Sequence, residues 1–156
     1  MTAQALFEAA RASGAVMTTA ESCTGGGIAV AITDVAGSSA IFDRSFVTYT
    51  NAAKVDMLGV TQATLDAFGA VSEQVAAEMA VGALAASDAT VAVSVTGIAG
   101  PGGSEHKPEG RVCFGIATAT GVTTELCEFG PLGRAHVRAR SVDHALNMLL
   151  QAVTAN

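Results

Sequence analysis

Several residue types are scarce in the sequence, and each scarcity excludes some classes of protein function. Trp is absent, Tyr occurs once, and only 14% of the 156 residues are charged. Lys occurs only at positions 54 and 107, and the formal net charge is -6. This balance excludes a general nucleic-acid binder, which needs many cationic side chains against phosphates. It leaves room for a small phosphorylated ligand held by one or two Arg.

Cysteine is also scarce, with thiols only at Cys23, Cys113 and Cys127. The odd count, without a CxxC or Cys/His metal spacing, predicts free thiols in a reducing compartment and no metal site. The N-terminus has the pattern of an amphipathic helix with Glu8 and Arg11 inside it, and not that of a secretory signal. Gly and Pro interrupt the longest uncharged stretches, so we expect no membrane span and a cytoplasmic, bacterial-type protein.

Apolar residues, by contrast, make up 50% of the chain, and its length is ample for one domain over residues 1–156. Helical periodicities alternate with β-branched runs, which predicts an α/β sheet covered by helices on both faces. A hairpin across Thr120 and Gly121 makes that sheet mixed. We expect strands at 15–20, 45–50, 90–98, 111–118 and 122–129. We expect helices at 2–13, 28–32, 61–68, 73–86 and 134–153, and a further helix that carries Lys54.

The first candidate site is the segment 20–27 (AESCTGGG), where a strand hands over to a helix. Ligands of open α/β sheets bind outside the carboxyl ends of strands, where a helix N-terminus offers free N–H groups. Ser22 is therefore a candidate nucleophile, and the N–H groups of Thr24, Gly25 and Gly26 are candidate donors to an oxyanion or a phosphate. An ordinary glycine turn with Ser22 or Thr24 as the helix N-cap explains the same residues equally well.

Cys23 is a rival nucleophile, because a thiol at a helix N-terminus can have a lowered pKa. A cysteine hydrolase also needs a His base nearby. His106, His136 and His144 fall in a loop and in the last helix, and the sequence places none of them near Cys23. A small packing residue is the simpler interpretation of Cys23.

The second candidate site is the segment 49–54 (YTNAAK), at the end of the 45–50 strand. With Asn51 as the helix N-cap, Lys54 lies in the first helical turn, where the helix dipole and burial both lower the pKa of an ammonium group. A neutral Lys can act as the base for a serine nucleophile, and Tyr49 could then relay a proton or hold the Lys. The alternative is a solvated Lys54 and an aromatic side chain that fills the core.

A glycine-rich loop follows the 90–98 strand. Its glycines would let the backbone approach a ligand closely. They are Gly97, Gly100, Gly102 and Gly103. The loop lacks the GK[ST] ending of a P-loop and the GxGxxG spacing of a dinucleotide fingerprint. Ser104 to Lys107 matches S-x-x-K, but Pro108 disfavours the helical turn that this motif needs, so we treat the match as chance.

Two arginines open the last helix. Arg134 and Arg138 are four residues apart and so share a helix face, and the same row continues into Val142 and Leu146, which should face the core. Arg138 is therefore expected to point inward, where it needs an anionic partner. A ligand phosphate and an internal Asp or Glu are both suitable partners.

Taken together, these segments resemble the C-terminal domain of the competence/damage-inducible protein CinA, a family that includes stand-alone nicotinamide-nucleotide amidohydrolases. The matching segments follow one another along nearly the whole chain: TTAESCTGG (18–26), ITDVAGSSAIFDRSFVTYTNAAK (32–54), GAVSE (69–73), VSVTGIAGPGGSEHKPEG (93–110) and GRAHVR (133–138). Many relatives also carry an N-terminal nucleotide-hydrolase domain, which we expect this chain to lack.

The resemblance implies a three-layer α/β/α sandwich with a mixed, mostly parallel sheet. It implies deamidation of nicotinamide mononucleotide to nicotinate mononucleotide and ammonia. The catalytic serine, tyrosine and lysine of the family fall on Ser22, Tyr49 and Lys54. Two departures touch the presumed ligand loops: Leu132-Gly133 stands where relatives commonly have GD before the arginine, and Arg111 replaces a small residue after the KPxG turn.

The resulting hypothesis is that Lys54 removes the Ser22 proton, directly or through Tyr49, and that water cleaves the acyl-enzyme. No metal or cofactor is expected. The substrate would be held by Asn51, Gly97, Gly100, Gly102, Gly103, and Arg134 or Arg138. Two rivals stay open: a non-catalytic nucleotide-binding module that regulates a partner, and a cysteine-dependent amidase that uses Cys23. Helices rich in Gly and Ala would suit a homodimer.

Overall fold

The computed structural model describes residues 2–155, so the two end residues of the predicted 1–156 domain lie outside the described residues. Five strands form one sheet in the order β2-β1-β3-β4-β5. The strands are β1 (Met17–Glu21), β2 (Phe42–Val47), β3 (Val91–Gly97), β4 (Arg111–Thr118) and β5 (Gly121–Glu128). The helices are α1 (Thr2–Ser13), α2 (Gly27–Thr33), α3 (Asn51–Leu58), α4 (Gln62–Phe68), α5 (Glu73–Ala85) and α6 (Arg134–Thr154), with a 3-10 turn η1 (Ser38–Ala40).

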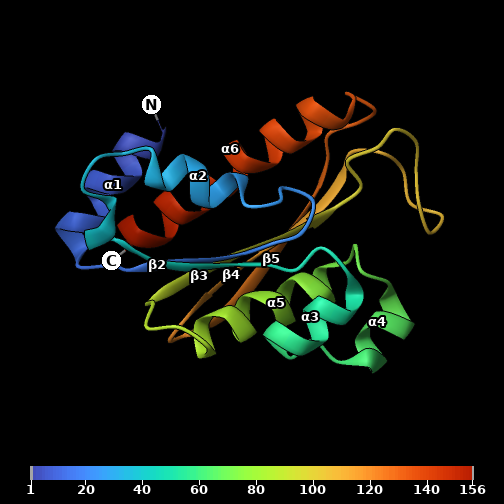
Figure 1. Ribbon diagram of the computed structural model, residues 1–156, viewed down its shortest axis with the longest axis horizontal. Helices are drawn as coiled ribbons and strands as arrows, with labels where there is room; N and C mark the ends of the chain where they lie inside the picture. The colour runs from blue at the N-terminus through green and yellow to red at the C-terminus, as the bar shows by residue number, and fades with distance from the viewer. Residues whose placement is uncertain (1, 156) are drawn as a thin grey trace.

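The sheet is mixed, as predicted. β1, β2 and β3 run parallel, β4 pairs antiparallel with β3, and β5 pairs antiparallel with β4, so four of the five strands point the same way. Figure 1 shows α1, α2 and α6 on one face and α3, α4 and α5 on the other, which confirms the three-layer arrangement. None of the helices within residues 2–155 combines the length and the apolar character that a membrane span needs.

Both faces of the central strand β3 are buried, because helices cover the sheet on both sides. On one side Leu146 and Leu149 of α6 pack on the sheet, and on the other side Val75, Met79 and Ala83 of α5 do so. These residues form the stripes that the helical periodicity predicts. The two cores fix the height of each helix layer above the sheet.

The helix α3 lies directly on α5 at Gly82. A Cβ atom at this position would collide with the backbone carbonyl oxygen of Leu58, the last residue of α3. Only Gly therefore lets the two helices approach this closely. This contact sets the position of α3, and with it the position of Lys54.

The predicted 45–50 strand was wrong at both ends: β2 begins three residues earlier, at Phe42, and ends three residues earlier, at Val47. Beyond it, the carbonyl groups of Thr48 and Tyr49 turn toward the Lys54 amine and accept hydrogen bonds from it. The predicted N-cap was also wrong. Thr50 has the extended conformation of an N-cap and accepts the Ala53 N–H on its side chain, so Asn51 is the first residue of α3.

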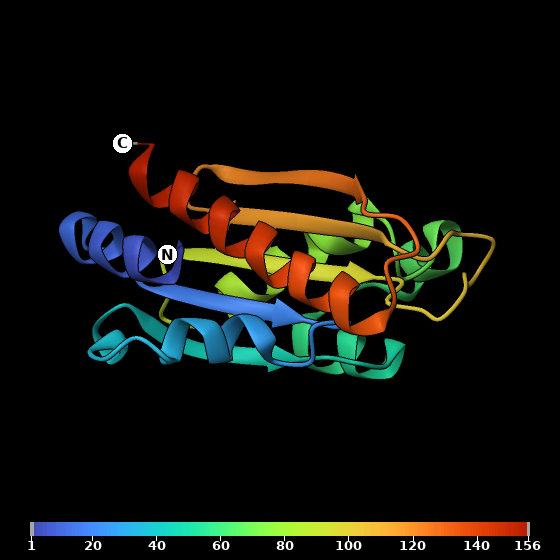
Figure 2. The same ribbon diagram turned by 90° about the horizontal axis from the view of Figure 1, so that it is seen from above.

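The carboxyl ends of the three parallel strands lie at one edge of the sheet. Glu21 pairs with Val47 of β2 and with Val95 of β3, so the segments that follow these strands emerge side by side. In Figure 2 the arrowheads of β1, β2 and β3 all point toward the end of the molecule where α6 begins. The fold thus brings together segments 22–26, 48–54 and 98–104, the segments that carry most of the candidate site residues.

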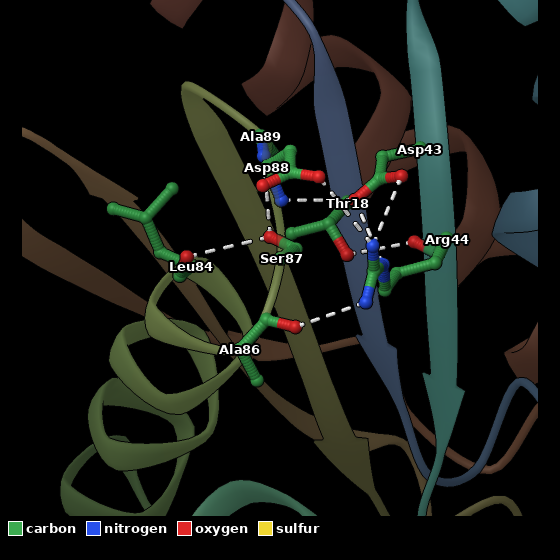
Figure 3. Close-up of polar contacts among 8 residues, drawn as sticks. All are labelled: Thr18, Asp43, Arg44, Leu84, Ala86, Ser87, Asp88 and Ala89. Carbon is green, nitrogen blue, oxygen red and sulfur yellow. Dashed lines mark hydrogen bonds and ion pairs between the residues drawn. The ribbon is translucent and has the colours of Figure 1, made fainter.

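The amino ends of the sheet are joined by a polar network around Arg44 (Figure 3). Its guanidinium donates to the Asp43 carboxylate at 2.8 Å and to the Ala86 carbonyl at 3.3 Å, and its own carbonyl accepts from the Thr18 hydroxyl at 2.7 Å. The N–H of Asp88 and the Arg44 guanidinium lower the pKa of the Asp43 carboxyl. This network attaches the edge strand β2 to the turn before β3, far from the candidate site.

Candidate active site

Ser22 is the first residue after β1, and its backbone is anchored to the neighbouring strand. Its N–H donates to the Val95 carbonyl at 3.0 Å, and its carbonyl accepts from the Gly25 N–H at 3.0 Å. The tight turn that follows is possible because Gly25 and Gly26 take positive φ angles. Ser22 itself is buried, and its hydroxyl faces α3.

Lys54 approaches Ser22 from α3, and its side chain is only 1% exposed. Its Nζ atom lies 3.1 Å from the Ser22 hydroxyl oxygen, 3.0 Å from the Thr48 carbonyl and 3.4 Å from the Tyr49 carbonyl. These three neighbours are all neutral. Burial lowers the pKa of Lys54 below the usual lysine value of 10.5. The amine is therefore prepared to accept a proton from the serine hydroxyl.

Tyr49 contributes its backbone, and not its phenol, to the surroundings of Lys54. The side chain is 59% exposed, and its hydroxyl accepts a hydrogen bond from Arg134 at 2.6 Å. The same guanidinium donates to the Gly100 carbonyl at 2.7 Å. Tyr49 and Gly100 thus hold Arg134 in place at the mouth of the site.

A cavity of about 350 Å³ opens over Ser22 and Lys54. The glycine-rich loop forms one wall of it, and the segment around Tyr49 and Asn51 forms another. Its lining residues are Ser22, Cys23, Tyr49, Asn51, Lys54, Ala70, Val71, Thr96, Gly97, Ile98, Ala99, Gly100, Pro101, Gly102, Gly103, Ser104, Glu105 and Arg134. This volume falls within the range of small-molecule sites, about 300–1,000 Å³.

Four of the residues expected to bind substrate lie outside this lining: Thr24, Gly25, Gly26 and Arg138. The Arg138 guanidinium points inward, as expected, but it donates to the backbone carbonyls of Cys23 (3.1 Å) and Thr24 (3.3 Å) and not to a carboxylate. Arg138 therefore braces the turn that carries Ser22.

The N-terminus of α2 is already capped by Glu21, a residue to which the sequence reasoning assigned no role. Its buried carboxylate accepts the N–H groups of Ile28 (2.9 Å) and Ala29 (3.0 Å) and the hydroxyls of Thr24 (2.6 Å) and Thr19 (3.0 Å). A carboxylate at a helix N-terminus is favoured by the helix dipole. The only sequence signal was an acidic residue directly before a glycine turn and a helix.

Cys23 lines the cavity, but its thiol is buried, and burial raises its pKa to about 12. None of the three His residues lines the cavity. Cys23 therefore has neither the accessible thiolate nor the neighbouring base that a cysteine nucleophile needs.

A further carboxylate, Glu109, organises the glycine-rich loop. It accepts the Gly102 N–H at 2.8 Å and the Gly133 N–H at 2.9 Å, and so ties this loop to the start of α6. Arg111 pairs with Glu128 across the β4–β5 hairpin, and the Lys107 amine donates to the carbonyls of Phe68 and Val71. The side chains of Arg111 and Lys107 thus have partners within the protein, and neither residue lines the cavity.

The fold and the site together define an α/β protein with a serine–lysine pair in a cavity at the carboxyl ends of parallel strands. The model of the CinA C-terminal domain matches residues 1–153. The chain belongs to this family.

Three relatives illustrate its range. The nicotinamide-nucleotide amidohydrolase PncC of Escherichia coli K12 is 54% identical over 152 residues, which cover 96% of this chain and 91% of the relative. A CinA-like protein of Chlorobium phaeobacteroides is 50% identical over 145 residues, but these cover only 34% of that longer protein. The crystal structure of a competence/damage-inducible protein from Agrobacterium tumefaciens matches with a TM-score of 0.93 and 50% identity, covering 98% of this chain and 93% of that one.

Proposed function

We propose that this chain is an amidohydrolase that deamidates nicotinamide mononucleotide to nicotinate mononucleotide and ammonia. The observation that carries the proposed chemistry is the 3.1 Å contact between the Lys54 amine and the Ser22 hydroxyl, inside a cavity of suitable size. The activity named for the Escherichia coli relative, at 54% identity over nearly the whole of both chains, supports the substrate.

In the proposed reaction neutral Lys54 takes the proton of the Ser22 hydroxyl, and the serine oxygen attacks the carboxamide carbon. The protonated Lys54 then gives this proton to the amide nitrogen, the C–N bond breaks and ammonia leaves. Water attacks the resulting ester while Lys54 again accepts a proton. Lys54 gives this proton to the serine oxygen as the ester bond breaks, which restores the Ser22 hydroxyl and releases the product acid, which ionises to the carboxylate.

We infer that the oxyanion is stabilised by the Cys23 N–H, and not by the N–H groups of Thr24, Gly25 and Gly26 that the sequence suggested. The Gly25 N–H already donates to the Ser22 carbonyl, and all three of these residues lie outside the lining of the cavity. The Cys23 residue follows the nucleophile directly and lines the cavity. A donor of this kind lowers the barrier by about 3 kcal/mol.

The 5′-phosphate is assigned to Arg134 and the glycine-rich loop, because Arg134 is the one arginine that lines the cavity within residues 2–155. We infer a cytoplasmic protein that acts on this small molecule and not on nucleic acid. The net charge of -6 supports a protein that does not act on nucleic acid. Three free thiols support a reducing, cytoplasmic compartment.

The test is ammonia release from nicotinamide mononucleotide by the wild type and by Ser22→Ala, Lys54→Ala and Cys23→Ala. Loss of Ser22 or Lys54 should reduce kcat at least about 10⁴-fold. Full activity of Ser22→Ala would eliminate the covalent serine scheme. A wild type that is thermally stabilised by the nucleotide without turning it over would indicate the regulatory binding module instead.

A further inference from the structure

A second cluster of reactive side chains lies apart from this cavity, where α6 crosses the edge strand β5. Glu125 and Cys127 alternate along β5 and so project from the same face of the strand, and His144 reaches them from α6. The His144 Nε2 atom lies 3.5 Å from the Cys127 sulfur and 3.2 Å from a carboxylate oxygen of Glu125. The three ligand atoms all lie within 4.8 Å of one another.

One ring nitrogen cannot satisfy both neighbours. Neutral Nε2 carries either one proton or one lone pair, so it serves as donor or acceptor in a single direction. The same geometry excludes a Cys–His–Glu catalytic triad, in which the carboxylate would bind the other ring nitrogen. An imidazole lone pair, a carboxylate and a thiol that loses its proton on metal binding are instead the ligands that a cation requires.

The two distances from the His144 Nε2 atom fit a tetrahedral ion. Bonds of about 2.0–2.1 Å to nitrogen or oxygen and about 2.3 Å to sulfur, at tetrahedral angles, separate nitrogen from sulfur by about 3.5 Å and nitrogen from oxygen by about 3.4 Å. The observed separations are 3.5 Å and 3.2 Å. Mg²⁺ and Ca²⁺ prefer oxygen ligands alone, whereas a mixed S, N, O set suits Zn²⁺.

The surroundings hold the imidazole in place and leave the cluster accessible. The ring centroid of His144 lies 4.5 Å from that of Phe114 and 6.2 Å from that of Phe129. The side chains of His144 and Glu125 remain 28% and 49% exposed. Glu125 also lines a cavity of about 700 Å³ that shares no residue with the one over Ser22. An ion can therefore reach the cluster from solvent, and a water molecule can complete its coordination.

We propose that Glu125, Cys127 and His144 form a binding site for one Zn²⁺ ion that joins the edge strand β5 to α6. The sequence spacing did not reveal this site, because two ligands lie on a strand and the third lies on a helix 17 residues further along the chain. His144 follows Arg134 by ten residues, about 15 Å along the helix axis, so the ion would lie apart from the amide chemistry.

The experiment is a titration of tag-free full-length protein with Zn²⁺ alone, against a chromophoric chelator, with Co²⁺ as a spectroscopic substitute. One equivalent should bind, and Co²⁺ should give a thiolate-to-metal charge-transfer band. Cys127→Ser and His144→Gln should each weaken Zn²⁺ binding at least about 100-fold and abolish or shift that band. Zn²⁺ should raise the melting temperature of the wild type but not that of Cys127→Ser or His144→Gln.

The matched control is His136→Gln, on the exposed first turn of the same helix, which should bind Zn²⁺ like the wild type. Glu125→Gln changes an exposed side chain and tests the third ligand with little effect on folding. The absence of stoichiometric binding overturns the proposal. Equal affinity in the wild type, Cys127→Ser and His144→Gln overturns it too, as does a loss of binding in His136→Gln alone.

Discussion

The Nζ atom of Lys54 lies 3.1 Å from the hydroxyl oxygen of Ser22, although 32 residues separate them in the chain. The two meet because β1 and β2 are parallel neighbours, so that the residues after both strands emerge at the same sheet edge. No carboxylate is among the hydrogen-bond partners of Lys54 in the described part of the chain. The direct partners of the amine are therefore neutral, and burial lowers the pKa of Lys54 more than the negative charge of Glu105 raises it.

The first prediction concerns pH. Because the reaction needs neutral Lys54, kcat/KM should rise with pH through the lowered pKa of this group and level off below 10.5. Stability should change in the same sense. Between the folded pKa and the unfolded value of 10.5, the unfolded chain binds the extra proton, so the free energy of unfolding rises with pH. Initial rates and chemical denaturation across this range measure both.

Lys54→Met supplies the control for stability, because it keeps an unbranched side chain that is one atom shorter and removes the titrating group. Its free energy of unfolding should lose the rise with pH and should exceed that of the wild type below the folded pKa, where the buried ammonium is most costly. A wild-type rate that is independent of pH would contradict the role of Lys54 as the base.

The second prediction separates the two nucleophiles. Cys23→Ala should keep kcat within about threefold of the wild type, since burial raises the pKa of this thiol to about 12 and leaves little thiolate at neutral pH. Steady-state kinetics and the rate of thiol alkylation at pH 8 are the measurements. Rapid alkylation of Cys23 that parallels loss of activity would support the cysteine mechanism instead.

The third prediction tests whether Tyr49 relays a proton or positions Arg134. Its hydroxyl binds Arg134 at 2.6 Å, so Tyr49→Phe should raise KM about tenfold by freeing the guanidinium, while kcat and its pH profile remain. Arg134→Lys is the companion variant and should raise KM more. A large fall in kcat for Tyr49→Phe with unchanged KM would show that the phenol takes part in proton transfer.

The fourth prediction concerns Thr48, which is fully buried and whose hydroxyl has no hydrogen-bond partner within residues 2–155. Thr48→Val keeps the shape of the side chain and removes the unpaired group, so it should raise stability by about 1 kcal/mol. Thr96→Val is the matched control. The Thr96 hydroxyl donates to the Ala70 carbonyl at 2.9 Å, and its loss should lower stability by about 1 kcal/mol. Thermal unfolding of both variants decides the point.

Much of the fold could be predicted from the sequence, because strong patterns dictate it locally. The burial stripe of α5, the β-branched run of β3 and the turn at Thr120 and Gly121 each specify an element with little help from distant residues. The end of β2 was predicted wrongly, because it depends on a tertiary contact. Residues that favour a strand continue to Thr50. The carbonyl groups of Thr48 and Tyr49, however, accept hydrogen bonds from the Lys54 amine, and the strand ends before them.

Less of the candidate site than of the fold could be predicted from the sequence. Spacing alone left the roles of Ser22 and Lys54 open, and the family resemblance singled them out. The partners of Arg138 depend on how α6 packs against the turn after β1, which no local pattern contains. The capping of α2 by Glu21 is local, but an acidic residue before a glycine turn is too common a pattern to specify it. The cluster at His144 escaped for the same reason.

The absence of a side chain at position 82 means that a substitution there should change the distance between the base Lys54 and the nucleophile Ser22. The height of the lysine above the serine is set by two backbones in contact, and no neighbouring rotamer can compensate for a spacer inserted between them. Even one added methyl group should lift the short helix and lengthen the gap that the proton must cross. Gly82 does not line the cavity, yet it helps to determine the distance over which the proton is transferred.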